Sequence, residues 1–130
     1  MIASIFIISV VASSFQNKVQ PKNVECAIIT MLTHNGEDLT KNYDRHIFCF
    51  RRGGELEACN DLFCEKGEWA ADNDVFQIAI NAASLNAQNQ NSIYGWLNGS
   101  WKIIEWNESA LELEKIDRDN WHVRFYGINR

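Results

Sequence analysis

The sequence has little of what marks several well-defined classes of protein. Its 130 residues include one proline, and its 12 Lys and Arg are outnumbered by 17 Asp and Glu, giving a net charge of −5. A duplex-binding protein carries a clustered basic footprint, whereas the basic residues here are scattered. The only long apolar run, Met1 to Ala12, falls short of the ~20 residues that span a bilayer as a helix. These absences argue against nucleic-acid binding and against stable membrane insertion.

Signatures of catalysis and of metal binding are also missing. No serine lies in a G-x-S-x-G motif, no glycine-rich phosphate loop is present, and the three histidines are more simply interpreted as surface residues near turns. Cys59 and Cys64 have the outermost spacing of one half of a zinc site. On a strand, however, His46 and Cys49 would point to opposite faces. We therefore expect no metal, no cofactor and no enzymatic activity.

The apolar opening has the length of a signal-peptide hydrophobic region, ~7–15 residues. Ala12 and Ser14 occupy the −3 and −1 positions of a cleavage after Ser14, and a polar stretch follows. No basic residue precedes the apolar run, and a buried first strand of Ile, Val and Phe is the alternative. The favoured interpretation is a signal peptide at 1–14 and one domain at 15–130, located outside the cytoplasm, in the periplasm or secreted.

The four cysteines are Cys26, Cys49, Cys59 and Cys64. An even set in a small exported domain is typical of a disulfide framework. The framework predicts two bridges, and four cysteines allow three ways of pairing them.

A hairpin signal, Gly53-Gly54, separates two short apolar stretches that hold two of these cysteines. A three-residue loop over Gly53 to Glu55 would place the apolar side chains of both stretches on one face: Phe48, Phe50, Leu56 and Ala58. The same register sets Cys49 opposite Cys59, which favours a Cys49–Cys59 bridge and leaves Cys26 for Cys64. Pairing of Cys26 with Cys49 and of Cys59 with Cys64 remains the rival.

Strand patterns dominate the rest of the chain. Residues 24–33 are apolar and β-branched on both faces, which is typical of a central strand. Three antiparallel strands are predicted at the end of the chain, over 101–106, 110–115 and 121–128. The expected fold is all-β: a small antiparallel sandwich or barrel of seven to eight short strands with a C-terminal three-stranded meander. Residues 74–90 fit a strand to about Asn81 or, in an α+β alternative, a helix.

Matching the apolar faces of the meander gives its register. One face holds Trp101, Ile103, Leu111, Leu113, Val123 and Phe125. The other holds three cross-strand rows, Lys102–Glu114–His122, Ile104–Glu112–Arg124 and Trp106–Ala110–Tyr126. Because these rows pair the carboxylates with cations, a catalytic carboxylate pair is not expected. The pattern also places Glu105 on the apolar face, where a carboxylate needs a partner; it is either a ligand contact at a barrel mouth or, as we favour, a residue at the sheet rim that reaches water. Lys115 lies between Trp101 and Trp121, either as a cation over tryptophan rings or as a side chain that extends along them to reach solvent.

These features favour a function in binding rather than in chemistry. The acidic charge favours a protein partner that is basic, such as a cationic hydrolase that the domain would inhibit. Exposed aromatic residues are enriched at recognition surfaces, so the candidate surface comprises Trp106, Arg124 and Tyr126, with Glu112 beside them. The second hypothesis is a small-ligand-binding barrel that uses Glu105 and the apolar face. A carboxylate-dependent hydrolase is the third, and the sequence makes no prediction of oligomeric state.

Gly99-Ser100-Trp101 resembles the G-x-W motif that opens the first strand of lipocalin-like barrels. In such barrels most of the strands follow the motif, whereas only three predicted strands can follow it here. Neither a fold nor a function is therefore transferred from this motif.

Overall fold

The computed structural model describes residues 25–80, 93–116 and 120–128. The predicted signal peptide and its alternative first strand lie outside this range. Nine strands follow one another within these residues: β1 Cys26–His34, β2 Glu37–Asp38, β3 Ile47–Phe50, β4 Glu55–Cys59, β5 Cys64–Asp72, β6 Val75–Ile80, β7 Gly99–Trp106, β8 Ala110–Lys115 and β9 Trp121–Gly127. The described ranges also hold two short 3₁₀ helices between strands, η1 Thr40–Tyr43 and η3 Gly95–Leu97. Within the described residues, no helix is long and apolar enough to cross a membrane.

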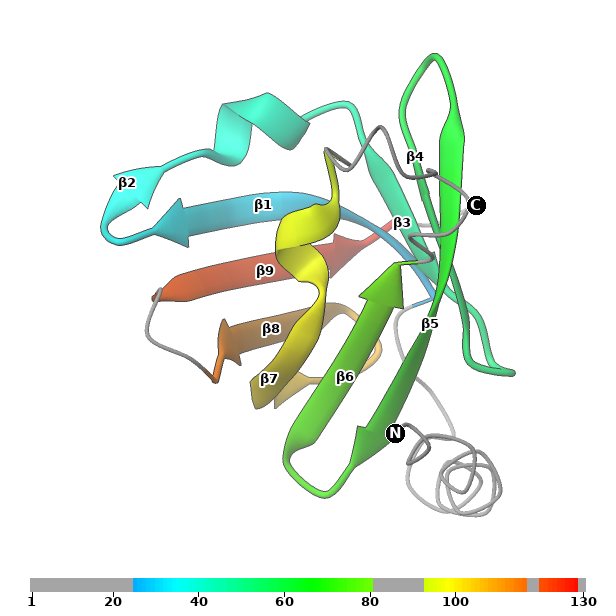
Figure 1. Ribbon diagram of the computed structural model, residues 1–130, viewed down its shortest axis with the longest axis vertical. Coiled ribbons are helices and arrows are strands. Elements are labelled where there is room, and N and C mark those ends of the chain that lie inside the picture. Colours follow the sequence, from blue (N-terminus) through cyan, green and yellow to red (C-terminus); the bar gives the residue numbers. More distant parts are fainter. Residues whose placement is uncertain (1–24, 81–92, 117–119, 129–130) are drawn as a thin grey trace.

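The strands form a closed antiparallel barrel (Figure 1). Each strand from β3 to β8 pairs with the next along the chain, β3 also pairs with β1, and β9 returns to pair with β1. Eight strands thus close the barrel, and β2 is an extra strand at the edge of β1. The all-β prediction is confirmed, with a barrel rather than a sandwich. Residues 75–80 form strand β6 and not the alternative helix; 81–92 lie outside the described residues.

The β3–β4 hairpin has the predicted faces but a different loop. Phe48 lies opposite Ala58 and Phe50 opposite Leu56, so the predicted apolar face is buried. The loop comprises residues 52–54, with Arg51 N donating to Glu55 O and Gly54 at φ +96°. A three-residue hairpin loop needs a left-handed residue in its last position, and Gly54 meets that need with no steric cost.

This loop makes the predicted Cys49–Cys59 bridge wrong. Moving the loop back by one residue shifts the strand register by two, which keeps the faces but sets Cys59 opposite Ile47. The disulfides are Cys26–Cys49 and Cys59–Cys64, the rival pairing, and each joins residues directly opposite on neighbouring strands.

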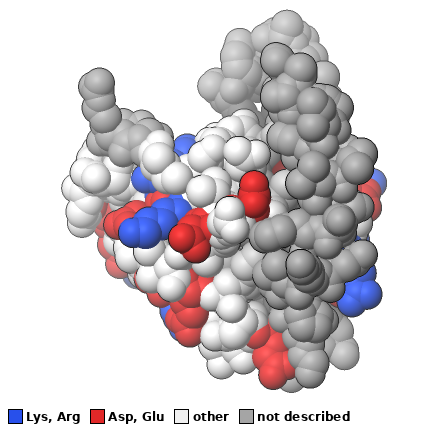
Figure 2. Space-filling view, turned by 90° about the horizontal axis from the view of Figure 1, so that it is seen from below, with Lys and Arg blue, Asp and Glu red and all other residues white. Residues whose placement is uncertain are grey.

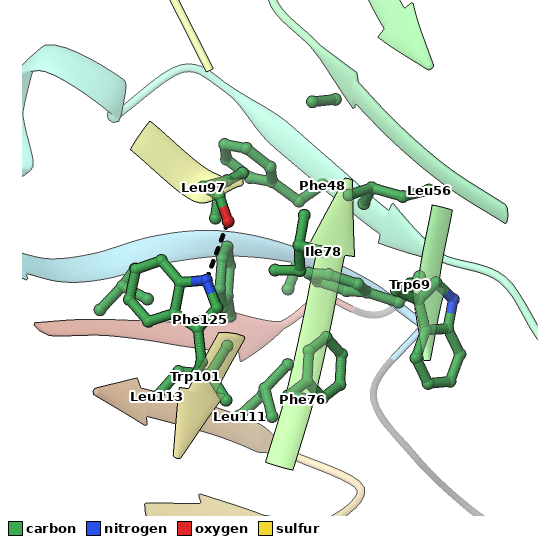
Figure 3. Close-up of a cluster of buried hydrophobic side chains, with 14 of the residues drawn as sticks. Phe48, Leu56, Trp69, Phe76, Ile78, Leu97, Trp101, Leu111, Leu113 and Phe125 are labelled. Atoms are coloured by element: carbon green, nitrogen blue, oxygen red, sulfur yellow. Dashed lines mark hydrogen bonds between the residues drawn. The ribbon is translucent and has the colours of Figure 1, made fainter. Parts of the chain in front are cut away.

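Aromatic rings fill much of the barrel interior (Figure 3). Phe125 makes edge-to-face contacts with Phe48 and Phe50, and Phe76 stacks on Trp69. Such pairs add about 0.5–1.5 kcal/mol beyond burial alone. Trp101 is fully buried and its indole Nε1 donates to Leu97 O at 2.8 Å, which ties η3 to the core. The predicted apolar face of the meander is therefore the inner wall of the barrel.

The meander has the predicted register except at the end of β7. Lys102 pairs with Glu114 and Ile103 with Leu113, as expected, but a β-bulge follows and Glu105 then pairs with Glu112. A bulge inserts one extra residue, so every side chain beyond it changes face. Glu105 therefore lies on the outer face, and Trp106 packs inward beside Leu111. The predicted positions of Glu105 and Trp106 are both wrong for this single reason.

The two ends of the barrel differ in construction. The hairpin end, as we call it, carries three tight turns, over 51–55, 72–75 and 106–110. The opposite end, called the η end, carries η1, η3 and the β4–β5 turn at 60–63, together with the first residues of β3, β7 and β9 (Figure 1). β1 pairs with β3 only through Cys26 and Ala27, near the hairpin end. Toward the η end, residues at the start of η1 replace β3 as hydrogen-bond partners of β1: Leu39 N donates to Leu32 O, and Thr40 Oγ1 accepts from Leu32 N.

Candidate functional site

A chain of aromatic rings crosses the η end. Its six members, which we call the ring ladder, touch in the order His34, Trp121, Trp96, Tyr43, His46 and Tyr94. The first three rings stack face to face, with centroid distances of 3.9 and 5.4 Å, and the others meet edge to face at 5.0 to 5.5 Å. The ladder joins β1, β9, η3, η1 and the segment before β3. Except for buried Tyr94, its members are partly exposed.

Polar groups lie beneath one end of the ladder. Glu65, on the inner face of β5, is 7% exposed and is the one buried charged side chain among the described residues. His46 Nδ1 lies 2.7 Å from Tyr94 Oη, which is hydrogen-bond distance, and Tyr43 Oη donates to Ile93 O at 2.8 Å. These contacts fix the ring orientations at the start of β3 and at η3.

Burial and charge shift the acid–base behaviour of these groups. Burial raises the pKa of Tyr94, and the charge of Glu65 raises it further. Burial also lowers the pKa of His46, although Asp44 and Asp61 oppose that shift. Both tyrosines of the ladder stay protonated at neutral pH, because burial raises the pKa of Tyr43 as well. The cluster therefore combines neutral rings with carboxylates.

Lys115 lies at the other side of the ladder, as its sequence position predicts. Its Nζ is 5.2 Å from the centroid of Trp101 and 6.0 Å from that of Trp121, and it donates to Trp96 O at 2.6 Å. An ammonium over indole faces gains about 0.5–2 kcal/mol. The rings of the η end thus already hold one cation.

Exposed apolar side chains gather at the same end. Seven large hydrophobic residues are exposed among those described, and five of them belong to η-end segments: Ile47, Leu62, Phe63, Ile93 and Ile116. Leu62 is 87% exposed, in a turn closed by the Cys59–Cys64 disulfide and by Asn60 Oδ1, which accepts from the N–H groups of Leu62 and Phe63. Clustered exposed apolar residues mark binding surfaces more often than single ones do.

The residues predicted as a binding surface only partly come together. Glu105, Glu112 and Arg124 form an ion-pair network on the outer face, with Arg124 Nη1 2.7 Å from a carboxylate oxygen of each glutamate. His122 Nε2 lies 2.7 Å from Glu112, and Tyr126 is exposed on the same face. Trp106 is not part of this surface.

In the outer-face network, the positive charge of Arg124 is paired with the negative charges of Glu105 and Glu112. The hydrogen bond from Arg124 lowers the pKa of Glu105 and keeps it ionised. Acidic side chains are widespread on the face seen in Figure 2, but basic side chains lie next to some of them. Exposed ion pairs of this kind typically stabilise a fold by about 1 kcal/mol or less each.

Sequence reasoning missed most of the η-end cluster. Tyr43, Tyr94 and Trp96 lie in connections with no apolar period, and barrel closure alone brings them together. Their one signal in the sequence is the density of aromatic residues, with three of five tryptophans, Trp96, Trp101 and Trp121, at this end.

Comparison with known proteins gives a likeness in fold. No protein-family model and no curated protein matches the chain. Among solved structures, a lipocalin-like protein from Bacteroides uniformis ATCC 8492 matches with a TM-score of 0.64 and 16% identity, over 81% of this chain and 97% of that one. An uncharacterized protein from Bacteroides eggerthii DSM 20697 matches with a TM-score of 0.56 and 14% identity, over 79% and 98%. The chain therefore has a lipocalin-like barrel fold.

Proposed function

We propose that this protein binds a small, largely apolar ligand at the η end of its barrel. The observation that carries the proposal is the gathering of partly exposed rings and exposed apolar side chains at that one end. Small-molecule sites are lined mainly by apolar and aromatic side chains with a few placed polar groups, and barrel mouths are a frequent location. The likeness to a lipocalin-like structure supports a barrel of this type.

The packing inside the barrel supports the η end as the location. At the hairpin end, Phe50, Phe76, Trp69 and Trp106 touch one another, so aromatic side chains take up the interior. At the η end, the ladder rings other than Tyr94 keep part of their surface exposed.

Two disulfides are typical of an oxidising compartment outside the cytoplasm, and they support a role for the protein there.

A titration with the neutral fluorophore 1-N-phenylnaphthylamine tests the proposal. Ile93→Ser and Ile104→Ser form a matched pair, because both isoleucines are similarly exposed, at 38% and 46%, but only Ile93 lies at the η end. Removing an apolar contact worth about 1 kcal/mol weakens binding about fivefold. We expect that loss in Ile93→Ser and not in Ile104→Ser. Absence of saturable binding by wild-type protein would reject the proposal.

A protein partner is the second candidate function, favoured by the β4–β5 turn. Leu62 projects from a turn that a disulfide and three hydrogen bonds hold in one shape. Such preorganisation lowers the entropy cost of docking. The net charge of −5 favours a basic partner. Biolayer interferometry against a panel of cationic hydrolases tests it: Leu62→Ser should abolish any binding that Ile104→Ser retains.

A further inference from the structure

One side of the ring ladder, which comprises Tyr43, His46, Tyr94 and the neighbouring Glu65 and which we call its polar side, has the composition of a site for a cation. Tyr43, His46 and Trp96 present partly exposed rings there. Buried Glu65 lies opposite Ala58, Ala58 lies opposite Phe48, and the Phe48 ring contacts the ring of Tyr94. Ring faces attract cations through their quadrupole, and aromatic cages are a recurrent way of recognising ammonium groups. A carboxylate kept from water attracts a nearby positive charge more strongly than an exposed one does.

The protein itself provides a precedent for this chemistry. The Lys115 ammonium lies over the rings of Trp101 and Trp121 and donates to Trp96 O. Trp96 also meets Tyr43 edge to face, so it links the rings around Lys115 to the rings near Glu65. One side of the ladder thus holds a resident cation by ring faces, and the other side offers similar rings together with a carboxylate.

Charges around the polar side favour the same class of ligand. Asp44 and Asp61 both act on His46, and the charge of Glu65 acts on Tyr94. Among the basic residues nearby, Arg45 is 3.6 Å from Asp61 and pairs with it, while Lys41 is exposed on η1. Both members of the Arg45–Asp61 pair are strongly exposed, so water screens them, whereas Glu65 is 7% exposed.

We propose that the ligand of the η end is a small organic cation with an apolar body. Its ammonium group lies against the rings of Tyr43 and Trp96, with Glu65 as the buried counter-charge, and its body contacts exposed Ile47 and Ile93. This inference rests on the proposed function, because it names the chemical class that the same site binds.

Three probes of similar size separate charge from shape. They share one benzyl group: benzyltrimethylammonium is cationic, neopentylbenzene is its neutral counterpart, and phenylmethanesulfonate is anionic. Binding of each is measured by isothermal titration calorimetry or by ligand-observed NMR with the full chain. We expect the cation to bind about tenfold more tightly than the neutral probe, and the anion to bind most weakly.

Two substitutions on one strand locate the counter-charge. Glu65→Gln removes a negative charge from the inner face of β5, and Glu68→Gln removes one from its exposed outer face. The cation preference should disappear in Glu65→Gln and persist in Glu68→Gln. Tyr43→Leu, which removes a partly exposed ring, should also reduce the preference and serves if Glu65→Gln does not fold.

The outcomes distinguish the two levels of the proposal. Equal or tighter binding of the neutral or anionic probe overturns the inference and leaves the proposed function standing. Equal loss of preference in Glu65→Gln and Glu68→Gln also overturns it, because general charge would then explain the effect. Saturable binding by none of the three probes contradicts the proposed function itself.

Discussion

The β-bulge in β7 and strict alternation along the sequence lead to opposite predictions for the face on which Trp106 lies. Strict alternation puts Trp106 on the outer face, whereas the bulge turns it inward against Trp69 and Phe76, at centroid distances of 6.2 and 5.4 Å. Trp106→Ala should therefore destabilise the barrel. Ile104→Ala, on the bulge residue itself, should not, because Ile104 is 46% exposed.

The magnitude follows from partial burial and ring contacts. A Trp side chain that loses half of ~200 Å² of contact area loses about 2.5 kcal/mol, at about 25 cal/mol per Å². The two ring pairs add about 1 kcal/mol, for a total of about 3.5 kcal/mol. That is a large part of the ~5–15 kcal/mol that stabilises a typical domain. Ile104→Ala should change stability by less than about 1 kcal/mol.

A third variant separates the ring from its N–H group. Trp106 Nε1 is buried and has no hydrogen-bond partner in the described part of the chain. An unpaired buried donor costs about 1–3 kcal/mol, so Trp106→Phe should be close to neutral. Urea unfolding monitored by circular dichroism measures all three variants. If Trp106→Ala unfolds at the wild-type midpoint, Trp106 faces solvent and the bulge is wrongly placed.

Three further outcomes are expected. Phe125→Ala, at a fully buried position, should cost about 3–5 kcal/mol in the same urea assay, and a change below 1 kcal/mol would contradict the core. Because the hydrogen bond from Arg124 lowers the pKa of Glu105 below its ordinary 4.5, the stability that Glu105 contributes is present above pH 4.5 and is lost as pH falls through the lowered value. The difference between wild type and Glu105→Gln should therefore shrink in acid melts. Removing the Cys26–Cys49 disulfide, with a sequence separation of 23, should lower the free energy of unfolding by about 1 kcal/mol more than removing Cys59–Cys64, with a separation of 5. The reason is that a bridge over a longer loop removes more entropy from the unfolded chain. Equal losses in the two double mutants to serine would contradict this.

Much of the barrel could be predicted because its strands alternate. In the meander, apolar Leu111 and Leu113 face apolar Phe125 and Val123, while Glu112 faces Arg124, so two hairpins agree on one register. Register is strongly specified wherever one face is buried. The disulfides lacked such a constraint, because shifting the β3–β4 loop by one residue leaves the faces unchanged and alters only which residue faces Cys59.

The bulge and the contacts at the η end could not be predicted from the sequence, for two different reasons. One extra residue at Ile104 changes no composition, and its only trace is the conflict of a glutamate, Glu105, on an apolar face. The site residues Tyr43, His46 and Trp96 lie outside the strands, where no period fixes direction. Their contacts depend on closure of the barrel between β1 and β9, which brings together segments far apart in the chain.

The five indole N–H groups allow the most direct test of a ligand site at the η end. Trp96, Trp101 and Trp121 lie at that end, and Trp69 and Trp106 at the hairpin end. In ¹H–¹⁵N spectra recorded with benzyltrimethylammonium and with neopentylbenzene, the indole signals of Trp96 and Trp121 should shift in a saturable way. Those of Trp69 and Trp106 should stay in place. Shifts confined to Trp69 and Trp106, or no shift with either probe, would contradict a ligand site at the η end.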